Sequence, residues 1–167
     1  MNFFFTADEH YGHEKSIYHN QRPFKSVEEM EKVLIKNHNS IVKKDDITIH
    51  AGDFVWKHSD EKQIIKKLNG NHIVLCGSHG FSKGQKQIWE KTIEGQKVVV
   101  CHYAMRTWAA SHYNSWQLHG HSHGGLEPIG KQIDVGVDTH NFFPWSWEEI
   151  CKTMDTRSDN FNLVERK

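Results

Sequence analysis

Short apolar runs alternate with amphipathic stretches along this chain, and the alternation predicts both strands and helices. After Ser26, which opens a Ser-x-x-Glu capping-box sequence, apolar residues recur at helical spacing and predict a helix over about 27–42. A second helix is predicted between a cap at Ser59 and Gly70. A last helix is predicted to begin at Ser146, where a second capping-box sequence occurs.

Continuous apolar and β-branched runs predict the strands, which occupy residues 3–5, 46–51, 72–76, 97–101, 116–120 and 131–137. The close succession of the last three favours an antiparallel or mixed second sheet. Periodicity leaves residues 80–96 open between a short helix and a strand. The tail 157–167 is expected to be a weak edge strand or a frayed end. Because the chain has the length of one domain, we expect residues 1–167 to form a single domain of α/β or α+β class.

Side chains able to ligate a metal follow most of the predicted strands. They are Asp8 and His10 after the first apolar run, Asp53 after the second, His79 after the third, His102 after the fourth, and His121 and His123 in a Gly-His-Ser-His sequence that closes the series. Since α/β folds assemble active sites at the carboxyl ends of strands, these side chains are expected to meet. Their composition is that of a dinuclear metal centre.

The order of these motifs resembles that of the calcineurin-like metallophosphoesterase superfamily, in which D-x-H, G-D, G-N-H-[DE], H and G-H-x-H follow one another. The resemblance spans residues 8–123, and the chain looks most similar to the small bacterial and phage phosphoesterases of that superfamily. It implies two mixed β-sheets packed as a sandwich and flanked by helices, with metals at the carboxyl edges of the strands. Two positions depart from the pattern, because Ser78 stands where the family has Asn and Gly80 where it has an acidic residue.

The resemblance also implies a role for each motif residue. Asp53 would bridge two divalent ions at the catalytic centre, with Asp8, His10 and His123 completing one site and Ser78, His102 and His121 the other. His79 would protonate the leaving oxygen; without an acid at position 80, either another acid such as Asp134 or Asp138 orients its ring, or His79 works poorly. Imidazole and carboxylate ligands without thiolate suit manganese or iron, which we favour, and also zinc or nickel.

Four residues near the motifs have open roles. His13 is either a contact for the substrate phosphate or a solvated loop histidine. Trp56, Tyr103 and Trp108 are either core or lid residues, or aromatic surfaces on which a base could stack.

Charge and cysteine content limit the partners and the compartment. Lys plus Arg and Asp plus Glu both total 21, so the formal net charge is zero and a long nucleic-acid track is not expected. The three cysteines are an odd number without C-x-x-C spacing, which favours core thiols in a reducing compartment. Because the chain shows neither a basic leader nor an apolar run of about 20 residues, we expect a cytoplasmic protein without a membrane partner.

Two classes of function remain open. The leading hypothesis is a metal-dependent phosphoesterase that hydrolyses phosphodiester or phosphomonoester bonds of a small nucleotide-like substrate. A protein phosphatase is disfavoured, because Asp53 is not followed by the D-R-G sequence that such enzymes carry after G-D-x-x. The alternative is a binding or scaffold module that keeps the fold but has lost turnover, for which Ser78 and Gly80 are the direct observation. The sequence does not indicate an oligomeric state.

Overall fold

The computed structural model describes residues 1–164 and contains two four-stranded sheets with flanking helices. The first sheet has the order β3-β2-β1-β8, with β1 at Phe3–Thr6, β2 at Ile47–His50, β3 at Asn71–Val74 and β8 at Trp145–Ser146. The second has the order β4-β5-β6-β7, with β4 at Ile88–Ile93, β5 at Gln96–Cys101, β6 at Trp116–His119 and β7 at Gln132–Asp134. The α-helices are α1 (Glu14–His19), α2 (Val27–Ile41), α3 (Glu61–Ile65) and α4 (Trp147–Asp155).

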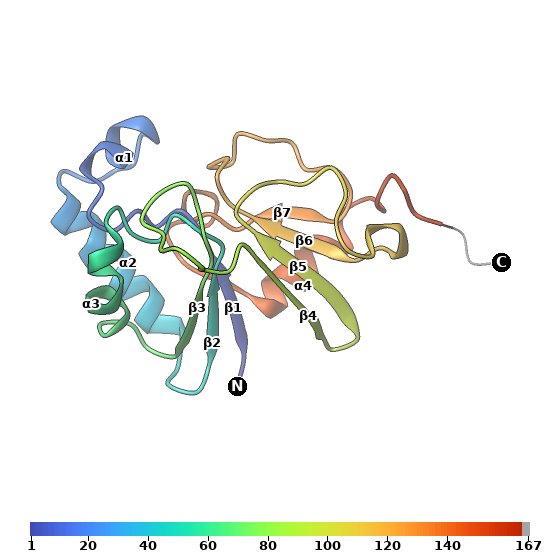
Figure 1. Ribbon diagram of the computed structural model, residues 1–167, viewed down its shortest axis with the longest axis horizontal. Coiled ribbons are helices and arrows are strands. Elements are labelled where there is room, and N and C mark those ends of the chain that lie inside the picture. Colours follow the sequence, from blue (N-terminus) through green and yellow to red (C-terminus); the bar gives the residue numbers. More distant parts are fainter. Residues whose placement is uncertain (165–167) are drawn as a thin grey trace.

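Both sheets are mixed, which confirms the predicted fold class. Strands β1, β2 and β3 run parallel, and β8 joins β1 in the antiparallel sense. In the second sheet β5, β6 and β7 run parallel, while β4 is antiparallel to β5. The parallel strands of both sheets point their carboxyl ends toward the middle of the molecule, where the long loops meet (Figure 1). This edge is where an α/β fold places a site.

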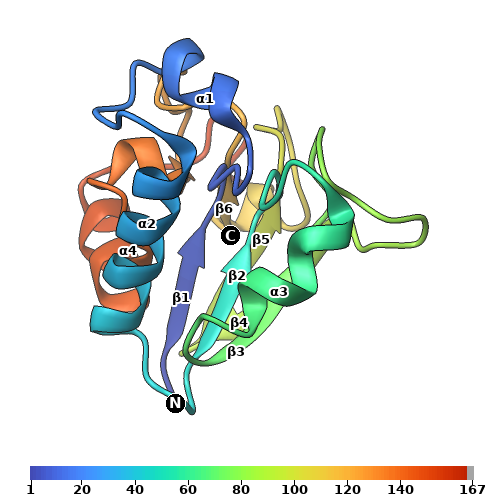
Figure 2. The ribbon, with the colours of Figure 1, turned by 90° about the vertical axis from the view of Figure 1, so that its left-hand side faces the viewer.

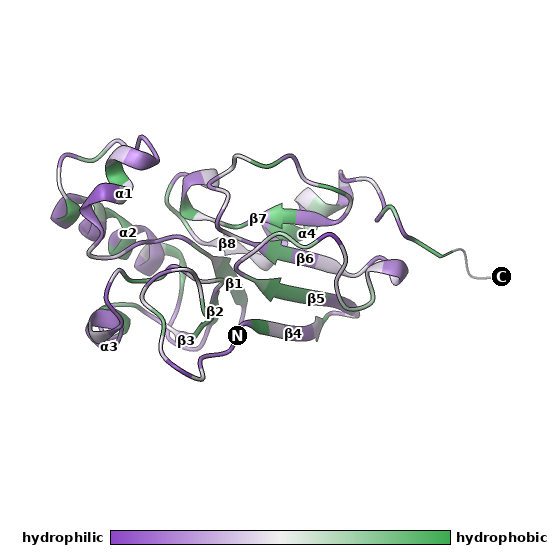
Figure 3. Cartoon of the chain, turned by 45° about the horizontal axis from the view of Figure 1, so that its top comes forward, coloured by the Kyte–Doolittle hydropathy of each residue, from purple (hydrophilic) through white to green (hydrophobic). Residues whose placement is uncertain are grey.

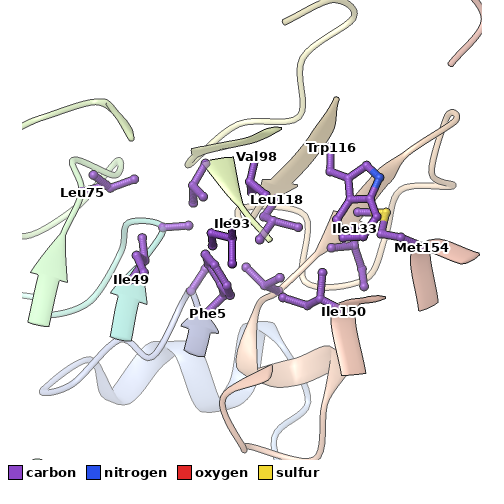
Figure 4. Close-up of a cluster of buried hydrophobic side chains, with 14 residues drawn as sticks. Phe5, Ile49, Leu75, Ile93, Val98, Trp116, Leu118, Ile133, Ile150 and Met154 are labelled. Atoms are coloured by element: carbon purple, nitrogen blue, oxygen red, sulfur yellow. The ribbon is translucent and has the colours of Figure 1, made fainter. Parts of the chain in front are cut away.

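The main hydrophobic core lies between the two sheets. The first sheet contributes Phe5 and Ile49, and the loop after β3 contributes Leu75. These side chains pack with Val98 and Leu118 of the second sheet, and Ile150 and Met154 of α4 close one end (Figure 4). Residues 98–101 are buried at every position, as expected for a strand covered on both faces. Figure 3 shows the hydrophobic residues concentrated on strands such as β1 and β5, with hydrophilic residues on the surrounding loops.

A second cluster packs helices against the outer face of the first sheet. Met30 and Leu34 of α2 and Ile64 of α3 contact Phe54 and Val55 in the loop after β2. Viewed from that side, α2 and α3 lie in front of the first sheet (Figure 2). The loop that carries Asp53 is therefore anchored by burial of the residues that follow it. Within the described residues, no helix is both long enough and apolar enough to cross a membrane.

Two of the three predicted helix starts are confirmed by their caps. Ser26 accepts a hydrogen bond from the backbone of Glu29, although the Glu29 carboxylate accepts from the N–H of Lys25 rather than from that of Ser26. Ser146 forms the complete capping box with Glu149 at the start of α4.

The predicted cap at Ser59 is wrong. The α-helix begins two residues later, after a short 3₁₀ segment at His58–Asp60, and the Ser59 hydroxyl donates to Asp60 instead of to the helix. Ser59 was mistaken for a cap because serine and aspartate side chains in a turn can form hydrogen bonds with neighbouring residues before the helix begins. The predicted end of this helix is also wrong, because α3 ends at Ile65; Gly70, with a φ of +99°, lies in the turn before β3.

The undecided stretch 80–96 contains a strand, β4. Glu94 and Gly95 connect it to β5 with φ values of +49° and +87°, the pair of positive values that a tight hairpin turn requires.

The tail is neither an edge strand nor a frayed end over its described part, which reaches residue 164. Asn160 is buried and its side-chain amide donates to the carbonyls of Ser111 and Ser115. The predicted tail also included residues 165–167, which lie outside the described residues.

Candidate metal centre

Six of the sequence-predicted ligands gather into two groups. Asp8, His10 and His123 form one group, and Asp53, His102 and His121 form the other; within each group the possible ligand atoms lie within 4.8 Å of one another. We refer to them as the Asp8 group and the Asp53 group. Each combines side chains from loops after different strands, so the groups exist only in the folded chain.

Asp53 lies between the two groups. Its Oδ2 is 3.4 Å from Nε2 of His102 and 3.8 Å from Nε2 of His10, which belongs to the other group. Its Oδ1 accepts hydrogen bonds from the backbone N–H groups of Ser78 and His79, at 2.6 and 2.8 Å. The turn can approach this closely because residue 77 is glycine: a Cβ there would lie 2.2 Å from Asp53 Oδ1. One carboxylate oxygen is thus held in place while the other faces both groups.

Hydrogen bonds fix which nitrogen two of the histidines present. Nδ1 of His102 lies 3.0 Å from the carbonyl oxygen of Ala51, an acceptor, so this nitrogen carries the proton and Nε2 offers its lone pair. Nδ1 of His123 lies 2.7 Å from Oδ2 of Asp138, which orients that ring in the same way. Backing of this kind by a carbonyl or carboxylate is typical of histidines that ligate metals.

Arg22 holds the carboxylate behind His123. Its Nε donates to Asp138 Oδ1 at 2.8 Å and its Nη2 to Oδ2 at 2.7 Å. The same guanidinium donates to the backbone carbonyls of Asp8 and Glu9. This buried side chain therefore joins the loop that carries Asp8 to the segment that carries Asp138. Burial acts to raise the pKa of Asp138, but hydrogen bonds from His123 and Arg22 outweigh it and lower that pKa below 3.8.

The residues present fit a divalent cation. Asp8 Oδ1 and His102 Nε2 are buried polar atoms without a hydrogen-bond partner, one in each group. Burial raises the pKa of Asp8 well above 3.8, and the neighbouring carboxylates Asp134, Asp53 and Glu9 add to this shift, so a cation at this position would be stabilising. Burial also lowers the pKa of His10 to about 3, so its imidazole is neutral and able to ligate. Donors about 2.1 Å from one ion lie up to about 4.2 Å apart, close to the observed spread.

The backbone of the site is strained. Asp8, His10, Asp53, His121 and His123 all have φ between +46° and +68°, a region that residues with side chains adopt rarely. Within the described chain eleven non-glycine residues have positive φ, so the candidate ligands account for nearly half of them. Such strain persists where the surroundings over-determine it, and it gathers at functional sites.

Ser78 is oriented toward Asp53. Its hydroxyl donates to Asp53 Oδ2 at 2.7 Å, the oxygen that faces both groups. The structure thus brings Ser78 to the centre as a hydrogen-bond donor to a candidate ligand.

His79 lies at the mouth of the centre, with its ring 5.8 Å from that of His10 and 5.6 Å from that of His13. The expectation that Asp134 or Asp138 orients this ring is wrong. Asp134 accepts from Ser122, Gly124 and Gly136, while Asp138 is used by Arg22 and His123.

Position 80 cannot hold the acidic residue of the family pattern. Gly80 has a φ of +59°, and a Cβ there would lie 1.8 Å from the carbonyl oxygen of Val55. The backbone itself therefore requires glycine, and the departure from the family pattern has a steric cause.

Two aromatic neighbours frame the entrance. His13 is half-buried, its Nδ1 lies 3.4 Å from Nδ1 of His10, and its ring stacks on Trp56 at 4.0 Å. Tyr103 is half-exposed and packs edge-on against His102 and His121, at 4.8 Å from each ring. Trp108, by contrast, is buried with its N–H donating to Ser115, so it offers no surface to a base.

Sequence reasoning missed the supporting residues. Arg22 and Asp138 are 116 positions apart and neither belongs to a motif. Glu9 lies inside the first motif, yet its carboxylate turns away from the metal groups and bonds to His50 at 2.6 Å. These residues are charged and become buried or half-buried in the folded protein. Their burial cannot be read from the sequence pattern, so no sequence signal identified them.

Comparison with known proteins supports the fold. No family model matches the chain. The uncharacterized protein MJ1445 of Methanocaldococcus jannaschii is 29% identical over 162 residues, covering 91% of this chain and 90% of the relative. The crystal structure of a protein of unknown function, AQ665 from Aquifex aeolicus, is 22% identical with a TM-score of 0.72, covering 91% of this chain and 98% of that one. At this identity the likeness shows a shared fold alone.

A more distant structural neighbour is a predicted phosphoesterase from Streptococcus pneumoniae TIGR4. It is 15% identical with a TM-score of 0.48, covering 81% of this chain and 70% of the other. This likeness is too low to carry an argument about function.

Proposed function

We propose that this protein is a metal-dependent phosphoesterase that hydrolyses phosphodiester or phosphomonoester bonds of a small nucleotide-like substrate. The observation that carries the proposal is the position of Asp53 Oδ2 between two groups of possible ligands, within 3.8 Å of a histidine from each. Two metal ions about 3.5–4 Å apart are a recurrent device for phosphoester hydrolysis, and a carboxylate shared between them offsets their repulsion.

The donor set indicates which ions the centre would hold. Imidazole and carboxylate ligands suit manganese or iron, with zinc and nickel as further candidates. Asp8, His10 and His123 would hold one ion; His102, His121 and the hydroxyl of Ser78 would hold the other, with Asp53 shared. Such ions would neutralise charge on the phosphate oxygens and increase the acidity of an attacking water.

Residues of the chain would supply the bridging carboxylate, the proton donor and a contact to the phosphate. Asp53 is kept ionised: burial acts to raise its pKa, but the nearby His102 ring and the hydrogen bonds from the Ser78 hydroxyl and the His79 N–H lower it below the ordinary value. His79, at the mouth of the centre, would give a proton to the leaving oxygen. His13, stacked on Trp56, would contact a phosphate oxygen from the same side.

Substrate size and compartment follow from other features. A net charge of zero does not favour a long polyanion, so we propose a small phosphoester. The three cysteines are free thiols, which supports action in a reducing cytoplasm.

One observation favours a second function, a metal-binding module without turnover. The Ser78 hydroxyl donates to Asp53 Oδ2, and its short side chain offers a weaker ligand than an amide oxygen.

Metal content and hydrolysis of bis(p-nitrophenyl) phosphate decide between the two functions. The metal-free protein would be titrated with Mn²⁺ and assayed beside Asp53→Asn, with His112→Gln, an exposed histidine that belongs to neither group, as control. We expect metal-dependent hydrolysis that Asp53→Asn abolishes and His112→Gln retains. Metal binding without hydrolysis would establish the module, and protein that takes up no metal at millimolar supply would overturn both functions.

A further inference from the structure

A cavity of about 530 Å³ opens beside the Asp53 group. His102 of the Asp53 group and Ser78, whose hydroxyl donates to Asp53, form part of its wall, so the cavity adjoins the candidate metal centre. Phe81, from the loop after β3, and Ile88, at the start of β4, also line it. So does Tyr103, which directly follows His102. A group attached to a phosphate at the centre would therefore enter this cavity directly.

The wall of the cavity is uncharged. Among the described residues that line it there is no lysine, arginine, aspartate or glutamate. Its two thiols are already engaged, because Cys76 donates to the carbonyl of Gly77 and Cys101 to that of Tyr103. Gln87 supplies the one side-chain amide. Such a lining favours an uncharged occupant with at most a few hydrogen-bonding groups.

Three large side chains of the wall are exposed to solvent. Phe81 is 52% exposed, Tyr103 50% and Ile88 45%, and none belongs to either hydrophobic core cluster. The Tyr103 ring is held edge-on by His102 and His121, at 4.8 Å from each, so it is fixed at the boundary between cavity and centre. Exposed aromatic residues grouped beside a polar centre are typical of a surface that stacks on a ligand ring.

We propose that this cavity binds the uncharged aromatic arm of the substrate, a nucleobase or an aryl group, while its phosphate lies at the metal centre. This inference rests on the proposed function. The other large cavities lack this connection. One of about 780 Å³ lies between the start of β1 and Trp147, and one of about 580 Å³ is lined by Lys62, Lys66 and His72; neither includes a candidate ligand.

Non-hydrolysable ligand pairs test the inference without relying on turnover. Calorimetry of the Mn²⁺-loaded protein would compare phenylphosphonate with methylphosphonate, and the 5′-methylenephosphonate of adenosine with that of ribose. We expect the aromatic member of at least one pair to bind about tenfold more tightly, since stacking on Phe81 and Tyr103 is available to it alone. A preference in the second pair alone identifies a nucleobase pocket, and one in the first pair alone an aryl pocket.

Two substitutions locate the effect. Phe81→Ala removes one stacking surface and Ile88→Trp fills the cavity; both are expected to abolish the aromatic preference while methylphosphonate binds as before. Phe161→Ala, at an equally exposed aromatic residue of the tail, serves as the control and is expected to change nothing.

The two possible failures are distinct. If methylphosphonate does not bind to the Mn²⁺-loaded protein, the phosphate site and with it the proposed function are lost. If all the phosphonates bind alike and neither cavity substitution changes them, the proposed function stands and the aromatic pocket is overturned.

Discussion

Nδ1 of His123 lies 2.7 Å from Oδ2 of Asp138. The Arg22 guanidinium bonds both oxygens of the same carboxylate, so the acceptor of the histidine proton is fixed on both sides. This arrangement determines the tautomer and the direction of a side chain in the Asp8 group, although neither Arg22 nor Asp138 would touch a metal.

Asp138→Asn is expected to weaken metal binding at the Asp8 group and spare the Asp53 group. An amide presents an N–H where Arg22 or His123 needs an acceptor, so the His123 ring loses its orientation. Changes of this kind typically reduce metal affinity about 10–100-fold. Calorimetric titration with Mn²⁺ would show one of two steps weakened. Asp155→Asn, an exposed carboxylate of α4, is the control, and equal weakening of both steps in Asp138→Asn would assign Asp138 a general structural role.

Asp53→Asn is expected to weaken both steps together. Its Oδ2 lies within 3.8 Å of histidines from both groups, and the substitution removes the shared negative charge while keeping the shape of the side chain. The same titration checks it. Loss of a single step would show that Asp53 serves one group only.

Ser78→Asn is expected to tighten the weaker of the two steps. Serine offers the Asp53 group a short hydroxyl that is already donated to Asp53, whereas asparagine would bring an amide oxygen toward the ion. In the unmodified protein we therefore expect two unequal steps. Two equal and tight steps would show that another ligand fills this position.

His79→Ala is expected to slow hydrolysis according to the leaving group. A phenolate of low pKa leaves without a proton, so the loss on a p-nitrophenyl ester is small; an alkoxide needs one, and the loss there is about 10²–10⁴-fold. Rates on p-nitrophenyl and alkyl esters of the same phosphate measure the difference. An equal loss on both esters would exclude His79 as the acid.

Gly80→Ala is expected to cost much more stability than Gly84→Ala. Both glycines have positive φ, +59° and +86°, so each substitution carries a backbone cost of about 1–2 kcal/mol. Only at Gly80 does the new Cβ also meet the carbonyl of Val55, whereas nothing lies within 4 Å of it at Gly84. Urea unfolding measures the two free energies, and equal values would mean that the loop moves aside freely.

The protein is expected to lose stability below pH 6.5 through His38. Burial lowers the pKa of this histidine from 6.5 to about 4, so the folded state favours the neutral ring. The unfolded chain takes up the proton first, and the stability present above pH 6.5 is lost as the pH falls toward 4. At pH 5 the loss is about 2 kcal/mol. His38→Gln should reduce the fall in the free energy of unfolding between pH 7 and 5 by about 2 kcal/mol, as measured by urea unfolding, whereas His112→Gln should retain the profile.

The sequence predicted six of the eight strands, most of which are apolar runs followed by a polar loop; β4 was left undecided and the two-residue β8 was not predicted. Parallel pairing of β1 with β2 then brings the residues after them to one edge, which is why Asp8 and Asp53 could be placed together. The supporting contacts could not be predicted in this way. Arg22 reaches Asp138 across 116 positions, and the clash that requires Gly80 involves a backbone atom of Val55. Both depend on tertiary packing, which leaves no periodic signal.

The left-handed backbone at five candidate ligands lowers the stability of the folded protein, while the side chains at those positions are the ones that could bind metal. Glycine adopts that conformation at no steric cost, so replacing His121 or His123 by glycine would relieve a local strain of about 1–2 kcal/mol while removing an imidazole. A laboratory selection for heat tolerance alone would therefore tend to erase these ligands one by one. The stabilised variants would keep both sheets but lose the metal ligands. Such a selection should therefore also require metal binding.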